Sequence, residues 1–170
     1  MSKFIISCFI LISSISLHAQ EVNHIITDKD LDMKILIGRA NENGLANPVF
    51  IENWQDALDS YTPDKLVAKK LRKIFRKSKT ISIKVFFGSW CGDSQEQIPN
   101  FVKLMHKTRF KNVEYYGVSR QKTMPCMDIS VYNIERVPTF VIYKDDVEIG
   151  RIIETPTISL EKDLVKILEP

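Results

Sequence analysis

The segment Ser89–Ser94 (SWCGDS) constrains this chain more than any other, because it joins a predicted strand to a predicted helix. Residues 81–87 are rich in β-branched and aromatic side chains, which indicates a strand. Residues 95–105 carry apolar side chains at helical spacing. Cys91 is therefore expected at a helix N-terminus, where free N–H groups and the positive end of the helix dipole favour a thiolate over a thiol.

The same segment holds a single sulfur. Ser94 stands three residues after Cys91, at the position where a redox pair would place its second cysteine. A disulfide within the motif is therefore impossible. Any redox chemistry at Cys91 needs a second thiol from elsewhere.

The N-terminus is typical of a secretory signal. Lys3 provides a positive start, residues 4–17 are mostly apolar, and Ala19 precedes a polar stretch. We predict a signal peptide over residues 1–19, cleavage near Ala19, and export to the periplasm or the outside of the cell. The apolar run is shorter than the roughly 20 residues that a membrane helix needs. The mature chain is therefore expected to have no membrane span.

Residues 20–80 predict a helical extension ahead of the main core. A helix is expected over residues 49–58, which place large apolar side chains on one face. A second helix is expected to begin with Thr62 as its N-cap and Pro63 at its first helical position. Residues 33–38 suit a short strand.

The second of these helices has a strongly basic outer face. Two interpretations fit it: a solvated surface, or a contact with an anionic partner or membrane surface. The net charge of +3 and the lack of a base-reading motif argue against nucleic acid as that partner. The basic residues are Lys65, Lys69, Lys70, Arg72, Lys73, Arg76, Lys77 and Lys79.

Residues 81–170 predict an α/β core that follows the helical extension. Further strands are expected over residues 112–118, 136–143 and 147–153, a short helix over residues 127–132, and a last helix capped by Ser159. A central mixed sheet with helices on both faces buries the apolar stripes of these elements.

This order of elements, with Trp90-Cys91-Gly92 at the first junction and Val137-Pro138-Thr139 opening the third strand, resembles the thioredoxin family. Pro99 matches the proline that kinks the long helix in thioredoxins. Val137-Pro138 matches their cis-proline bond, which lies against the active-site sulfur. The resemblance covers residues 81–170 and implies a three-layer thioredoxin-like fold. The motif looks like that of exported bacterial thioredoxin-like proteins.

Three positions depart from the family pattern. Ser94 replaces the resolving cysteine, and Val85 occupies the place of a buried acid that shuttles protons. Asp93 stands where thioredoxin has proline, and puts a carboxylate into the first turn of the helix. An anion so close to Cys91 disfavours the thiolate, so Asp93 is a candidate modulator of the thiol's acidity.

Three interpretations of Cys91 remain open. As a nucleophile, it would form mixed disulfides with protein or small-molecule thiols, Ser94 would donate a hydrogen bond to it, and no cofactor would be needed. Trp90 would then form an apolar rim, and the backbone of Val137 and Pro138 would align the substrate. Alternatively, the protein is a redox-silent module that binds peptides beside Pro138. In the third interpretation Cys91 is a small buried apolar residue.

Cys126 is the other cysteine outside the predicted signal peptide, and export places both where disulfides can persist. It is either a displaced resolving cysteine or an inert thiol. A disulfide with Cys91 requires Cα atoms within about 7 Å. Met124 and Met127 add soft ligands beside Cys126, but no second cysteine or histidine has the spacing of a metal site, so no metal is expected. The sequence leaves the oligomeric state open.

Overall fold

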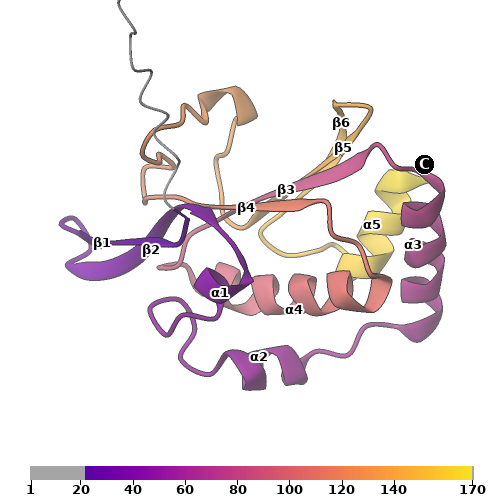
Figure 1. Cartoon of the computed structure of the whole chain (residues 1–170), viewed down its shortest axis with the longest axis horizontal. Helices are drawn as coiled ribbons and strands as arrows, with labels where there is room; N and C mark the ends of the chain where they lie inside the picture. The colour runs from indigo at the N-terminus through magenta and orange to yellow at the C-terminus, as the bar shows by residue number, and fades with distance from the viewer. Residues whose placement is uncertain (1–21, 170) are drawn as a thin grey trace, which may run out of the picture.

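A six-stranded mixed sheet forms the centre of the computed structural model, which describes residues 22–169 (Figure 1). The expected signal peptide lies outside the described residues. The strands stand in the order β1-β2-β4-β3-β5-β6. Strands β3 and β4 run parallel, and every other neighbouring pair is antiparallel. The strands are β1 (His24–Asp28), β2 (Met33–Ala40), β3 (Ile81–Phe87), β4 (Val113–Gly117), β5 (Thr139–Lys144) and β6 (Val147–Ile153).

Strand β3 is the central strand and is covered on both faces. Ile83 pairs with Val113 of β4 on one side and with Ile142 of β5 on the other. Two apolar clusters lie on the two faces of the sheet. Ile83 and Val85 point into the larger cluster, and Phe86 points into the smaller one on the opposite face. The predicted strand over residues 81–87 is therefore confirmed, and it delivers the chain to Cys91 from the middle of the sheet.

Five helices pack their apolar sides into the larger cluster, on one face of the sheet (Figure 1). The longest, α4, follows β3 directly and contains the buried Pro99. The expected α/β class is confirmed. The helices are α1 (Glu42–Leu45), α2 (Trp54–Ser60), α3 (Lys65–Lys77), α4 (Gly92–Thr108) and α5 (Leu160–Leu168).

The opposite face of the sheet is covered by residues 118–138, which lie above the sheet in Figure 1. Met124, Ile129 and Ile134 from this segment are buried against Phe86 and Tyr116 of the sheet. The short helix expected over residues 127–132 is reduced to one 3-10 turn, Ser130–Tyr132. A loop, rather than a helix, therefore forms the third layer.

The segment ahead of β3 differs from the expected helical extension. It contains helices, but β1 and β2 also form a hairpin that joins the main sheet through β4. Helix α3 begins after Asp64, whose Oδ1 accepts the N–H groups of Leu66 and Val67 at 2.8 and 3.1 Å, so Asp64 and not Thr62 is the N-cap. No helix within residues 22–169 is long and apolar enough to cross a bilayer.

The C-terminal elements follow the sequence prediction closely. Strands β5 and β6 form the expected hairpin through the turn Asp145-Asp146, where both residues have positive φ. Ser159 caps α5 as expected, and its hydroxyl accepts the N–H of Lys162 at 3.4 Å. Helix α5 packs against α3, which closes the helical layer beneath the sheet.

Candidate functional site

Cys91 is the N-cap residue of α4, immediately beyond the end of β3. Its backbone N–H donates to the carbonyl of Gly88 at 2.9 Å, which closes a tight turn between strand and helix. The carbonyl of Cys91 accepts the N–H of Gln95 at 3.0 Å and so begins the helix. The side chain is half-buried, and its thiol donates to the carbonyl oxygen of Val137 at 3.3 Å.

The segment facing this thiol is Val137-Pro138, whose peptide bond is cis, the isomer that the resemblance implies. Both residues are buried. The carbonyl of Pro138 accepts the N–H of Glu154 at 2.7 Å. Glu154 also forms an ion pair with Arg136 at 2.8 Å. The structure therefore brings Cys91, Val137 and Pro138 together and ties their segment to the end of β6.

Ser94 lies in the first turn of α4 and is fully buried. Its hydroxyl oxygen accepts the backbone N–H of Gly88 at 3.2 Å. Among the described residues, no hydrogen bond joins Ser94 to Cys91. The structure thus differs from the expected contact with the thiol, because the hydroxyl holds the turn that precedes Cys91.

Trp90, which was expected to form an apolar rim, is also held in place by a hydrogen bond. Its indole N–H donates to the carbonyl of Val118 at 2.9 Å. The ring also covers Gly88, where an added Cβ would lie 2.6 Å from the indole, so only glycine fits beneath it. The guanidinium carbon of Arg120 lies 5.9 Å from the ring centroid, within the range of a cation–π contact.

Asp93 and Val85 occupy different environments near the thiol. Asp93 is exposed in the first turn of α4, where a carboxylate interacts favourably with the positive end of the helix dipole. Val85 is fully buried in the larger apolar cluster. No acid therefore lies beneath Cys91 at the position of Val85.

Ser89 also supports the site, although no sequence pattern indicates it. Its hydroxyl oxygen accepts the backbone N–H of Leu36 at 2.9 Å, which attaches β2 to the turn before Cys91. The carbonyl of Ser89 accepts a hydrogen bond from the Gln95 side-chain amide at 2.9 Å. No local signal marks this role, because it depends on a residue 53 positions earlier in the chain.

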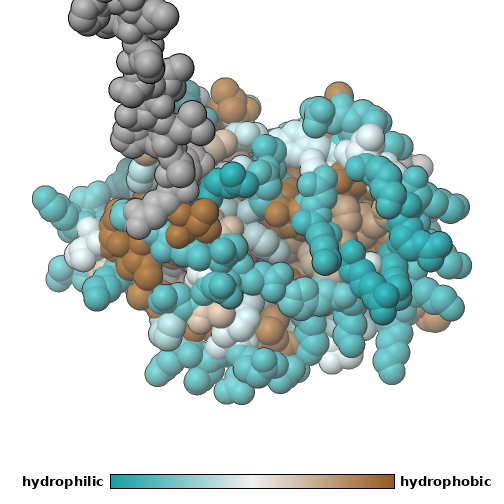
Figure 2. Space-filling view, in the orientation of Figure 1, coloured by the Kyte–Doolittle hydropathy of each residue, from teal (hydrophilic) through white to brown (hydrophobic). Residues whose placement is uncertain are grey.

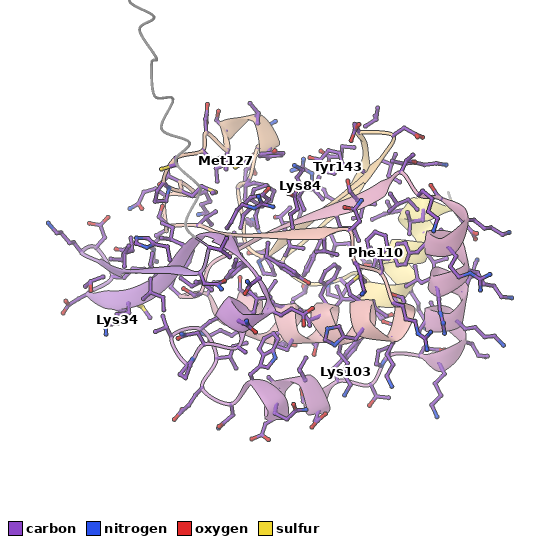
Figure 3. The ribbon with its side chains drawn as sticks, in the orientation of Figure 1. Lys34, Lys84, Lys103, Phe110, Met127 and Tyr143 are labelled. Carbon is purple, nitrogen blue, oxygen red and sulfur yellow. The ribbon has the colours of Figure 1, made fainter. Side chains whose placement is uncertain are left out.

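Cys126 lies within residues 118–138, the segment that covers the sheet on the face opposite the helices. It is exposed and has φ +60°, in a tight turn bridged by Met124 and Met127. Figure 3 shows Met127 in this loop, on the side of the sheet away from α4. Cys126 lines a hollow of about 150 Å³ against β1 and β2, and Cys91 is not among the residues that line it. Within residues 22–169, no His, Cys, Asp and Glu side chains gather in a group able to hold a metal ion.

One protein-family model matches the chain. The sequence model described as thioredoxin matches residues 49–165, so the match begins before β3 and includes α2 and α3. A thioredoxin-like protein of Acanthamoeba polyphaga mimivirus is 27% identical over 89 residues, which are 52% of this chain and 64% of that protein. The chain thus spans less than two thirds of that relative's length.

Solved thioredoxin structures also match. Thioredoxin from Fasciola hepatica is 23% identical, with a TM-score of 0.39 over 59% of this chain and 90% of its own. Mitochondrial thioredoxin 3 from Saccharomyces cerevisiae, in its oxidized form, is 25% identical, with a TM-score of 0.40 over 65% of this chain and 98% of its own.

Proposed function

The chain belongs to the thioredoxin family, and on this premise we propose that it is an exported single-cysteine thiol–disulfide exchange protein. Membership of this family supports a thiol–disulfide redox function in general. The observation that carries the narrower proposal is the position of Cys91. Its half-buried sulfur lies at the N-terminus of α4 and 3.3 Å from the carbonyl oxygen of Val137.

The proposed reaction is an exchange that needs no bound cofactor. The Cys91 thiolate attacks one sulfur of a protein or small-molecule disulfide, and the substrate S–S bond breaks. A mixed disulfide with Cys91 forms, and the second substrate sulfur leaves as a thiolate. An external thiolate then attacks the mixed disulfide, which regenerates Cys91 and forms a new disulfide. Disulfide bonds are exchanged, with no net oxidation or reduction.

The contact between Cys91 and Val137 links ionisation to substrate binding. The Cys91 thiol donates to the Val137 carbonyl, but a thiolate has no proton to donate. Deprotonation therefore releases the carbonyl to accept an N–H from an extended substrate backbone. Cys91 stands at the N-terminus of α4, where the free N–H groups of a helix attract an anion, and the exposed Asp93 lies in the same first turn.

The supporting roles follow from the contacts around the sulfur. Trp90, held by Val118, would form the apolar side of the substrate site. Ser94 would support the site indirectly by bonding Gly88. Cys126 remains a candidate resolving cysteine, which would require the loop around it to move toward Cys91.

A redox-silent peptide-binding module is the second candidate. It is favoured by the residue types at two positions: Ser94 stands in place of a resolving cysteine, and the buried Val85 stands in place of an acid. The peptide would occupy the same segment beside Pro138, and Cys91 would take no part in turnover.

Reactivity of Cys91 separates the two functions. The protein is incubated with iodoacetamide at mildly acidic pH, and separately with glutathione disulfide, and adducts are located by mass spectrometry. Exchange predicts that Cys91 is alkylated about tenfold or more faster than free glutathione and forms a mixed disulfide. The Cys126→Ser variant should retain both reactions, and Cys91→Ser should lose them. A Cys91 that reacts no faster than glutathione would favour the binding module.

Export is part of the proposal because residues 1–19 have the features of a signal peptide. The test is N-terminal sequencing of the protein recovered from the periplasm or the medium. A new N-terminus close to Gln20 supports export, whereas a protein that starts at Met1 in the cytoplasm contradicts it.

A further inference from the structure

A hollow of about 330 Å³ lies between the end of α3 and the connection from α4 to β4. Helix α4 starts beside Cys91 and ends here, and its 17 residues span roughly 25 Å. The hollow is therefore far from the thiol. Figure 3 labels Phe110, which lines the hollow and lies next to α3.

The charged side chains that line this hollow are all cations. Three come from or just after α3, and two from the segment that follows α4. No aspartate or glutamate lines the hollow, and none of these five cations forms an ion pair with a residue of the described part of the chain. The cations are Arg72, Arg76, Lys79, Arg109 and Lys111.

Some cations outside the hollow do have a carboxylate partner. On the same helix, α3, Lys70 pairs with Glu169, the C-cap residue of α5, at 2.9 Å. Elsewhere Arg39 and Lys84 share Glu114 at 3.1 and 3.2 Å. The fold thus supplies carboxylates to cations in several places, but not to the five around the hollow.

The helix dipoles do not balance this charge. Helices α3 and α4 both end beside the hollow, at Lys77 and Thr108, and each C-terminus is equivalent to roughly −0.5 charge. Together they offset about one positive charge of the five, which leaves about four. Arg76, Lys79, Arg109 and Lys111 are exposed, so solvent and a ligand can reach them. The surface over α3, on the right of Figure 2, is mostly hydrophilic.

The other polar groups of the hollow already have partners. The Thr108 hydroxyl donates to the carbonyl of Met105 at 3.0 Å, and the Asn112 amide donates to the carbonyl of Ile81 at 2.8 Å. Phe110 stacks on Phe75 with centroids 4.0 Å apart, which gives the hollow a fixed apolar wall. The groups left to bind a ligand are the guanidinium and ammonium groups.

We propose that this hollow binds a multiply charged phosphate-type anion, either free in solution or as a lipid headgroup. Three of the five cations are arginines, whose planar groups bind oxyanions through paired hydrogen bonds. Of the two interpretations of the basic helix, an anionic partner is the one that this site supports. The inference does not depend on the chemistry of Cys91.

The test compares two double variants that remove equal charge. Arg76→Gln with Lys111→Gln changes one exposed cation on each wall of the hollow. Lys69→Gln with Lys73→Gln changes two exposed lysines of α3 that do not line it. Pyrophosphate binding is measured by calorimetry, and vesicle binding by sedimentation with phosphatidylcholine alone or mixed with phosphatidic acid. Ionic strength is kept near 50 mM, and circular dichroism confirms that each variant is folded.

The lining variant should bind about tenfold or more weakly, because it loses two charge-assisted contacts. The control variant, Lys69→Gln with Lys73→Gln, should keep most of the affinity. Loss of pyrophosphate binding identifies a free anion, and loss of binding to phosphatidic acid vesicles alone identifies a headgroup. The proposal is overturned if neither probe binds, or if both variants weaken binding equally, since that result means a diffuse surface charge.

Discussion

The hydroxyl oxygen of Ser89 accepts the backbone N–H of Leu36 at 2.9 Å, and both residues are fully buried. This single bond connects the N-terminal hairpin to the turn that positions Cys91. It explains how a segment outside the expected core becomes part of the support of the site.

Replacing Ser89 with alanine should destabilise the protein by about 1–3 kcal/mol, because the buried N–H of Leu36 loses its acceptor. Urea unfolding measures the loss. The matched control is Ser60→Ala, since Ser60 is exposed at the end of α2 and its loss should change stability by less than about 0.5 kcal/mol. Equal stability of the two variants would contradict the role assigned to Ser89.

Gly88→Ala should displace the Trp90 ring. The added Cβ would lie 2.6 Å from the indole, and overpacking of this kind costs about 1–3 kcal/mol. In a Trp54→Phe background, Trp90 is the one tryptophan left of the two, and its fluorescence should shift to the red as the ring moves into water. Gly92→Ala is the control, because a Cβ there meets nothing within 4 Å, and its spectrum should not change.

Ser94→Ala should lower stability by about 1–3 kcal/mol, because the buried N–H of Gly88 loses its acceptor. Alkylation of Cys91 should continue, since the thiol bonds Val137 and not Ser94. Urea unfolding and timed alkylation check the two halves of this prediction. If alkylation is lost while stability is retained, Ser94 acts on the thiol and not on the turn.

Ser94→Cys should restore the missing half of a redox pair. The new sulfur stands three residues after Cys91, in the first turn of α4. Mild oxidation should then close a disulfide between positions 91 and 94, which peptide mapping by mass spectrometry detects. The experiment uses the chain from Gln20 onward with Cys126→Ser, so that the new cysteine is the one partner left for Cys91. An open pair after oxidation would mean that the turn holds the two sulfurs apart.

Glu161 should make stability depend on pH. Burial raises the pKa of Glu161, but hydrogen bonds from the Tyr61 hydroxyl and the Asp64 N–H outweigh it and hold the pKa below its ordinary value of 4.5. A lowered pKa means that the contribution is present above about pH 4.5 and lost as the pH falls through the folded value. Glu161→Gln should therefore cost about 1–3 kcal/mol at neutral pH and progressively less in acid.

Urea unfolding of wild type and Glu161→Gln at several pH values measures this effect. Glu135→Gln is the control, because Glu135 is exposed and should show a small difference at every pH. A cost for Glu161→Gln that stays constant from neutral to acid pH would show that the carboxylate charge is not what stabilises the contact.

The sequence predicted best those elements whose apolar pattern is local. The alternation of residues 81–87 and the helical spacing after Cys91 both led to the observed β3 and α4. Strand β1 has no such pattern, because its residues are mostly half-buried and its pairing depends on β2. The start of α3 was misplaced since Thr62 and Asp64 are both good caps, and the choice depends on Glu161, which accepts the Asp64 N–H 97 positions away.

In the candidate site, too, the sequence predicted the local spacing but not the contacts that depend on the folded chain. Spacing and the resemblance placed Cys91 beside Val137 and Pro138, and the structure brings them together. Spacing also placed Ser94 one turn from Cys91, but it could not show that the hydroxyl faces Gly88. The direction of a small buried side chain depends on which backbone group lacks a partner, and that is known only once the turn is formed.

The hairpin of β1 and β2 also determines how the sheet ends. Strand β2 covers β4 through Gly38–Ala40, and it passes so close that a Cβ on Gly117 would lie 2.4 Å from the Leu36 carbonyl oxygen. Without this cover, β4 would present unpaired N–H and C=O groups, which pair readily with strands of other molecules. Proteolysis within the hairpin would therefore create an aggregation-prone protein, so the hairpin protects solubility as well as supporting the thiol.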